Sequence, residues 1–278
     1  MSDNLDSLFR LDGKVIVITG AAGLLGQMHA EAIAAYGGTP ILLDLNFNAV
    51  QLLADSLNQK YDINCKGYQV DITDETQVKN NANQVKLDFG CINGLINNAA
   101  NNPKVETDNS ENFSRLENFP INIWEQDIAV GLTGAFNCAK YYGVFISENI
   151  DGGSIVNISS DLGLIAPDQR LYADPNKPKH LQSVKPVTYS VVKAGLIGLT
   201  RYLATYWAED GVRCNAMCPG GIENGQPSEF IDKVSNLIPL KRMAKANEYQ
   251  GTLIWMLSDA SSYLNGSIVP VEGGRSVW

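Results

Sequence analysis

Seven short apolar runs recur along this chain, and most are separated by ten or more residues with helical periodicity. The runs cover residues 14–19, 40–44, 65–70, 94–97, 154–158, 212–216 and 267–271. Intervening patterns such as residues 25–36, 49–59 and 76–86 have the spacing of amphipathic helices. Runs this short and this continuously apolar are typical of strands that are buried on both faces. The alternation predicts an α/β fold, a doubly wound parallel sheet with helices on both faces.

Length and composition are consistent with one such domain that spans residues 1–278. The chain has 278 residues, of which 45% are hydrophobic, and no Pro-rich or Gly/Ser-rich linker divides it. Its formal charge of −9 disfavours nucleic acid as a partner. No run approaches the length of a membrane span, and the first nine residues lack the pattern of a signal peptide. We therefore expect no nucleic-acid or membrane partner.

Five scattered cysteines and two histidines complete the inventory of potential metal ligands. Only Cys214 and Cys218 lie close together in sequence, and neither His29 nor His180 is beside them. Free buried thiols in a cytoplasmic protein are favoured over a zinc site, so we expect no metal.

Two long irregular stretches, residues 101–122 and 161–186, interrupt the alternation. Both follow the ends of predicted strands, where open α/β sheets bind their ligands. Disorder is the alternative for each stretch. Apolar anchors such as Phe113, Leu171 and Tyr172 favour loops that cover a substrate.

A glycine-rich turn follows the first predicted strand and precedes a helix. Gly20, Gly23 and Gly26 allow a tight turn, a close approach of backbone to a pyrophosphate, and close packing of helix on strand. Asp44 closes the second strand, where a carboxylate accepts hydrogen bonds from ribose hydroxyls and repels a 2′-phosphate. The motif predicts a single Rossmann-like domain that binds NAD rather than NADP. The alternative for Asp44 is a turn-initiating or helix-capping acid.

Two further strand ends carry polar residues. Asp71 follows the third strand, where it either meets the adenine amino group or caps the next helix. Asn97 and Asn98 end the fourth strand, where side-chain amides can tie neighbouring strand ends together.

A candidate catalytic group lies at the start of a strongly helical segment. Tyr189 and Lys193 are four positions apart and share one helix face, and Ser160 ends the fifth strand. An ammonium near a phenol lowers the phenol pKa, which makes the tyrosine a usable general acid or base. The serine hydroxyl can stabilise charge on a substrate oxygen. An ordinary amphipathic helix is the alternative reading of the Tyr-x-x-x-Lys spacing.

Taken together, these motifs resemble the short-chain dehydrogenase/reductase family, in its single-domain branch. The resemblance runs from residues 11–14 to residues 271–274 and includes Trp124 and residues 132–136, 213–215 and 219–222 in family order.

The resemblance implies hydride exchange between a nicotinamide and a secondary alcohol or ketone. It implies that Tyr189 moves the proton, that Lys193 binds the nicotinamide ribose and lowers the tyrosine pKa, and that Ser160 positions the substrate oxygen. It also implies a homodimer or homotetramer that assembles through the helices around residues 124–145 and 189–207. The positions that match cofactor contacts of the family are Gly20, Leu25, Asp44, Asp71, Ile72, Asn98, Ala99, Pro219, Gly220 and Ile222.

The chain departs from the pattern of this branch in several places. Its glycines are spaced Gly-x-x-Gly-x-x-Gly, Gly131 replaces a relay asparagine, and Asn224 replaces a threonine. The interval of 29 positions from Ser160 to Tyr189 is more than twice the usual one. The segment after Asn98 is also extended, and chains with both extended loops and this glycine turn resemble enzymes of surface-polysaccharide and unusual-sugar metabolism, which favours a polar, sugar-derived substrate.

Two other functions are alternatives to an NAD-dependent enzyme that acts on a sugar-derived substrate. A 3-oxoacyl-carrier-protein reductase would use the same three residues, but Asp44 and the negative charge disfavour it. A non-catalytic NAD-binding protein is supported only by Gly131.

Overall fold

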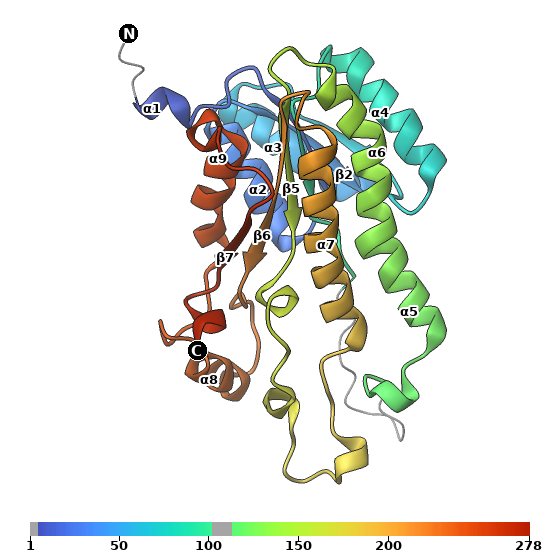
Figure 1. Cartoon of the computed structure of the whole chain (residues 1–278), viewed down its shortest axis with the longest axis vertical. Helices are drawn as coiled ribbons and strands as arrows, with labels where there is room; N and C mark the ends of the chain where they lie inside the picture. The colour runs from blue at the N-terminus through green and yellow to red at the C-terminus, as the bar shows by residue number, and fades with distance from the viewer. Residues whose placement is uncertain (1–4, 102–112) are drawn as a thin grey trace.

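A single parallel sheet of seven strands organises the computed structural model, which describes residues 5–101 and 113–278 (Figure 1). The strand order is β3-β2-β1-β4-β5-β6-β7. Successive strands are added toward one edge of the sheet from β1 to β3 and toward the other edge from β4 to β7. The boundary between β1 and β4 is therefore the switch point where sheets of this type bind ligands. The strands are β1 (Val15–Thr19), β2 (Thr39–Asp44), β3 (Lys66–Gln69), β4 (Gly94–Asn97), β5 (Gly153–Ile158), β6 (Val212–Pro219) and β7 (Ile268–Val271).

Helices cover both faces of this sheet, which confirms the predicted doubly wound α/β fold. One apolar layer joins α2, α3 and α9 to the sheet, and the other joins α4, α6 and α7. The helices are α1 (Leu5–Leu8), α2 (Leu24–Ala35), α3 (Phe47–Tyr61), α4 (Glu75–Phe89), α5 (Ile121–Ile128), α6 (Gly134–Ser147), α7 (Val187–Tyr206), α8 (Ser228–Asn236) and α9 (Gln250–Leu257).

Strand β1 shows why the runs are continuously apolar. All five of its residues are buried, and successive side chains point to opposite faces. Ile16 and Ile18 pack into the layer of α2, whereas Val15 and Val17 pack into the layer of α4.

The segment from residue 161 to residue 186 folds into three single turns of 3-10 helix rather than disordered coil. These turns are η3 (Asp161–Gly163), η4 (Gln169–Tyr172) and η5 (Lys179–Leu181). The segment lies beyond the carboxyl ends of the strands, at the same end of the molecule as α8 and the C-terminus (Figure 1). In the other predicted loop, residues 102–112 lie outside the described residues, and the remainder contains η1 (Leu116–Asn118).

Among residues 5–101 and 113–278, no helix combines the length and the apolar character that crossing a bilayer requires.

Candidate active site

The glycine turn after β1 has almost no room for side chains. Gly20 has a left-handed φ of 63°, and a Cβ there would lie 2.9 Å from the Cα of Ala99. A Cβ on Gly26 would lie 2.3 Å from the carbonyl oxygen of Gly20, so this glycine brings α2 against the turn. Gly23 is the N-cap of α2 and supplies no side-chain cap, which leaves the first N–H groups of the helix available to an anion.

Asn98 ties the turn to the neighbouring strand end, as predicted. Its Nδ2 donates to the carbonyl oxygens of Thr19 and Gly20 at 3.0 and 3.1 Å. Asn97 makes a similar tie on the other side, donating to Asn157 of β5 at 2.8 Å.

Asp44 is a turn acid and also lies where a cofactor ribose would be expected. Its two oxygens accept from the backbone N–H groups of Ala22 and Asn46, each at 3.0 Å. The side chain also lines the large cavity that begins at the glycine turn. Neither residues 20–26 nor residues 45–47 include a lysine or arginine.

Asp71 does not cap helix α4, which was one of its two predicted roles. Asp74 is the N-cap and accepts from the N–H groups of Thr76 and Gln77. Asp71 instead accepts from the backbone N–H and the hydroxyl of Thr73, at 2.9 and 2.7 Å. It lines the large cavity together with Ile72.

One continuous cavity of about 1,270 Å³ contains nearly every predicted site residue. Of the predicted set only Gly26 does not line it, because that glycine packs helix on turn instead. The predicted residues along its walls are Gly20, Gly23, Leu25, Asp44, Asp71, Ile72, Asn98, Ala99, Ser160, Tyr189, Lys193, Pro219, Gly220 and Ile222. The glycine turn, with no space for a Cβ at Gly20 or Gly26 and with a helix N-terminus behind it, fits a dinucleotide pyrophosphate.

The three candidate catalytic residues converge at the far end of this cavity. The hydroxyl of Tyr189 lies 3.4 Å from Oγ of Ser160 and donates to it. Nζ of Lys193 donates to the carbonyl oxygen of Ile158 at 2.8 Å and lies 5.8 Å from the centre of the Tyr189 ring. The neighbouring Ser159 donates to the carbonyl oxygen of Lys193 and so anchors α7.

Electrostatics at this end differ from the sequence expectation. Burial raises the pKa of Tyr189, partly opposed by its hydrogen bond with Ser160, and Lys193 is not among the groups that shift it. Burial also lowers the pKa of Lys193 to about 8. In the protein alone the pKa of the Tyr189 phenol is therefore raised, not lowered as the sequence predicts. Removal from water disfavours both the tyrosine phenolate and the lysine ammonium.

Lys185 is a second lysine beside the tyrosine that the sequence did not single out. Its Nζ lies 3.9 Å from the centre of the Tyr189 ring, and burial lowers its pKa to about 8. Nothing in the local pattern marks it, since it precedes α7 in a proline-containing loop.

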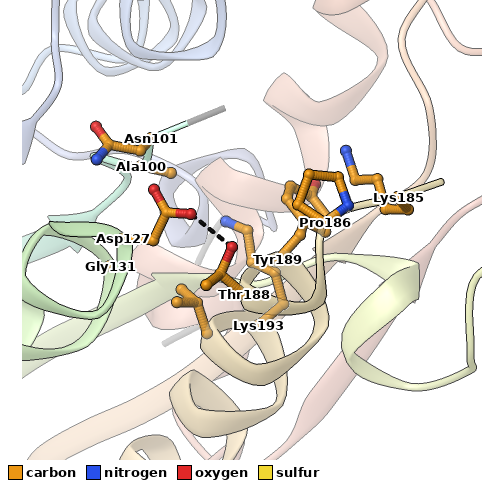
Figure 2. Close-up of a pocket in the computed structure, with 10 residues that line it drawn as sticks. Ala100, Asn101, Asp127, Gly131, Lys185, Pro186, Thr188, Tyr189 and Lys193 are labelled. Carbon is orange, nitrogen blue, oxygen red and sulfur yellow. Dashed lines mark hydrogen bonds between the residues drawn. The ribbon is translucent and has the colours of Figure 1, made fainter. Parts of the chain in front are cut away.

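A small pocket of about 10 Å³ lies behind Tyr189 and Lys193, next to Gly131 (Figure 2). Buried Asp127 on α5 points across it and accepts from the hydroxyl of Thr188 at 2.5 Å. Gly131 belongs to a π-helical turn, Ala129–Thr133, and a Cβ there would lie 2.3 Å from Cγ1 of Val192. A relay asparagine therefore has no room at this position.

Asp161 and Arg275 form a further pair that the sequence did not predict. Both are buried, both line the large cavity, and Nη1 of Arg275 lies 2.8 Å from Oδ2 of Asp161. Asp161 directly follows Ser160 in the chain, but no local pattern indicates its partner.

The large cavity lies at the switch point between β1 and β4 of a parallel sheet, and it contains a serine, a tyrosine and a lysine at one end. This combination defines a dinucleotide-dependent oxidoreductase. Comparisons with known proteins agree. A family model described as enoyl-(acyl carrier protein) reductase matches residues 20–276.

Similar proteins cover almost the whole chain. An NADP-dependent mannitol dehydrogenase of Alternaria alternata is 33% identical and aligns with 98% of this chain and 96% of its own. A 3-oxoacyl-[acyl-carrier-protein] reductase of Thermotoga maritima is 30% identical over 95% of this chain and 98% of its own. The structure of an NAD+-bound xylitol dehydrogenase is 25% identical and superposes with a TM-score of 0.82, covering 95% of this chain and 99% of that one.

The chain belongs to the short-chain dehydrogenase/reductase family. It is a nicotinamide-dependent oxidoreductase that acts on CH–OH groups, interconverting a secondary alcohol and a ketone.

Proposed function

We propose that this protein is an NAD-dependent dehydrogenase of a polyol or another sugar-derived secondary alcohol. The observation that carries the proposal is the single cavity that joins Asp44 and the glycine turn to Ser160, Tyr189 and Lys193. The side-chain amides of Asn101 and Asn224, which also line this cavity, offer hydrogen bonds to a polyhydroxylated substrate. The mannitol and xylitol dehydrogenases among the similar proteins support the same substrate class.

The proposed chemistry divides among three side chains. Tyr189 takes the proton of the substrate hydroxyl in the oxidative direction and returns it in the reductive one. Ser160, within hydrogen-bond reach of the tyrosine hydroxyl, positions the substrate oxygen. Lys193 lies behind the tyrosine, where it binds the nicotinamide ribose. The bound nicotinamide supplies hydride acceptance and donation at the carbon that bears this oxygen.

Replacing Tyr189 with phenylalanine tests this assignment. The variant keeps the ring but has no proton to exchange, so we expect kcat to fall by at least about 100-fold with a panel of polyols and keto-sugars. Thermal unfolding is measured in parallel to establish that the variant is folded. Near-wild-type turnover on a confirmed substrate would remove Tyr189 from the mechanism.

The preference for NAD is supported by the charges around the adenosine end of the cavity. In the part of the chain that the structure describes, the charged residues that line this end of the cavity are Asp44 and Asp71. Both are acids that would repel a 2′-phosphate. Known family members use either dinucleotide, so this is a property of these particular side chains.

Asp44→Ala tests the NAD preference. We expect the ratio of kcat/KM with NADP to kcat/KM with NAD to rise about tenfold or more, since one repulsive carboxylate near a phosphate costs about 1–2 kcal/mol. Asp55→Ala, which removes a carboxylate from α3 outside the cavity, is the matched control. An unchanged ratio in Asp44→Ala would contradict the assignment.

A 3-oxoacyl-carrier-protein reductase is the second candidate, supported by the Thermotoga maritima relative. The net charge of −9 disfavours docking of an acidic carrier. Turnover of a 3-oxoacyl thioester with NADPH, exceeding that of every polyol with NAD, would favour this second function.

Assembly as a homodimer or homotetramer is part of the proposal. Tyr202 and Tyr206 stack on each other on α7 with 61% of each side chain exposed, and Phe136 on α6 is 52% exposed. Aromatic side chains exposed on neighbouring helices support burial against a second copy. A cytoplasmic location is also proposed, supported by five cysteines that are all free thiols.

A further inference from the structure

The buried Asp161–Arg275 pair brings the end of the chain to the residue that follows the candidate catalytic serine. Asp161 begins η3, separated from the end of β5 by two residues, and Arg275 begins the turn η8 (Arg275–Val277). Their side chains are 3% and 8% exposed, and the residues lie 114 positions apart. In every other salt bridge among the described residues, at least one of the two side chains is partly or fully exposed.

The same carboxylate also holds the serine. Oγ of Ser160 donates to Oδ1 of Asp161 at 2.8 Å, and the backbone N–H of Leu162 donates to Oδ1 at 2.8 Å and lies 3.2 Å from Oγ. Oδ2 is occupied by Arg275 at 2.8 Å. Each carboxylate oxygen therefore has a fixed donor, and the guanidinium determines which oxygen faces the serine.

We infer that Asp161 and Arg275 are positioning residues that fix Oγ of Ser160 beside the site of the substrate oxygen, with its single proton held by Asp161 and a lone pair facing the Tyr189 hydroxyl. This inference rests on the proposed role of Ser160. Arg275 orients the Asp161 carboxylate, the carboxylate fixes Oγ, and Oγ is then held 3.4 Å from the hydroxyl of Tyr189. The pair acts through the serine and does not itself exchange protons or electrons with the substrate.

A purely structural role is the competing explanation, because breaking any buried ion pair destabilises a protein. Two double variants separate the explanations. Asp161→Val/Arg275→Met removes the ion pair and the acceptor for Ser160. Asp161→Asn/Arg275→Met removes the same ion pair but keeps an amide oxygen that can accept from the serine hydroxyl.

The expected result is a difference in activity between two proteins that have lost the same pair. We expect kcat of the Val/Met variant to fall about tenfold or more, the effect of one lost hydrogen bond at the reacting centre. The Asn/Met variant should fall by less, about threefold, because it keeps an acceptor for Ser160 but loses the guanidinium that orients it. In a Ser160→Ala background the two double variants should be equal, since the residue they position is gone. Equal activities with Ser160 present, or a difference that persists without it, would overturn the inference.

The electrostatics at Tyr189 provide a second readout. Asp161 raises the pKa of Tyr189 and Arg275 lowers it, while burial is the larger effect. The other charged or titratable groups around Tyr189 are Lys185 and Lys193, both near its ring, Tyr172 and Tyr249, which interact with it electrostatically, and Asp127 across the small pocket. None of these groups is replaced in the single variants Asp161→Asn and Arg275→Met. A shift in the Tyr189 pKa between wild type and either variant therefore reports the effect of the residue that was replaced.

Opposite shifts are expected from the two single variants. Arg275→Met should move the midpoint of the pH profile of kcat/KM for alcohol oxidation upward, and Asp161→Asn should move it downward. Shifts in the same direction would contradict a field set by this pair. Inactivity of the wild type on every polyol would refute the proposed function instead. The inference would then be decided with a secondary alcohol or ketone outside the polyols that the enzyme does turn over, by the same comparison of the two double variants with and without Ser160.

Discussion

Two adjacent serines at the end of β5 have different tasks because successive side chains of an extended chain point to opposite sides. Ser159 points toward α7 and donates to the carbonyl oxygen of Lys193. Ser160 has extended backbone angles, φ −164° and ψ 161°, and faces the Tyr189 hydroxyl. The family resemblance implies that Ser160 is the catalytic serine, and the alternation of side chains gives a physical reason why Ser160 rather than Ser159 faces the tyrosine.

At the same scale, His29 on α2 is a buried group whose titration should affect folding. It is fully buried, and neither ring nitrogen has a hydrogen-bond partner among the described residues. Burial lowers its pKa from 6.5 to about 4, because the charged ring would lose its hydration. The unfolded chain therefore binds this proton more readily than the folded protein does.

We predict that this difference makes the protein less stable as the pH falls from about 6.5 toward 4. The histidine's contribution to the free energy of unfolding should be about 2 kcal/mol smaller at pH 5 than at pH 7. Urea unfolding of wild type and His29→Leu at both pH values measures it. The leucine variant should lack this part of the pH dependence, and an identical pH dependence in both proteins would show that His29 does not contribute.

At the scale of elements, the π-helical turn between α5 and α6 controls how closely α7 approaches. Gly131 in this turn faces Val192 of α7, and the small pocket behind Tyr189 lies beside their contact. π-turns inside helices are frequent at functional sites. The glycine is thus required by packing, which explains why the family's asparagine is missing without implying loss of catalysis.

Gly131→Asn should therefore destabilise the protein rather than restore a relay. Its Cβ would meet Val192 at 2.3 Å, and overpacking of this kind costs about 1–3 kcal/mol. We expect the Tm to fall by about 2–8 °C, with no gain in kcat. Gly251→Ala in α9 is the control, because a Cβ there meets nothing within 4 Å. A Tm equal to wild type in Gly131→Asn would contradict this packing argument.

At the scale of the whole molecule, the exposed aromatic residues on α6 and α7 determine the expected assembly. A native mass of two or four times 30.2 kDa is predicted by light scattering. Tyr202→Glu should shift the mass toward that of a single chain, because a buried unpaired carboxylate is unfavourable at an interface. Leu87→Glu, at an even more exposed apolar position on α4, should leave the mass unchanged. A wild-type mass of 30.2 kDa would refute the proposed assembly.

The sequence predicted the sheet more completely than the site. All seven predicted strands are present, and the run at residues 94–97 has the observed bounds of β4. Strand β6 continues to Pro219, beyond the predicted residue 216, because it pairs with β7 through that residue. Apolar periodicity reports burial, so it predicts elements well and their ends less well.

The candidate site also contains residues that local sequence patterns predict and residues that only the folded chain brings together. The glycine turn, Asp44, and the Tyr189–Lys193 pair are local patterns, and the structure brings them to one cavity. Asp161 and Arg275 meet from opposite ends of the second half of the chain, and Lys185 reaches the tyrosine from an irregular loop. The direction of the Tyr189 pKa also depends on burial, which no local pattern determines.

The order of the two functional halves along the chain has a consequence for synthesis. The glycine turn, Asp44 and Asp71 lie on strands β1 to β3, which leave the ribosome before β5, α7 and the final turn exist. The acids expected at the adenosine end are therefore synthesised before any residue of the candidate reacting centre. The ion pair that we infer to hold Ser160 can form only after Arg275 has also been synthesised, because its two members lie 114 positions apart.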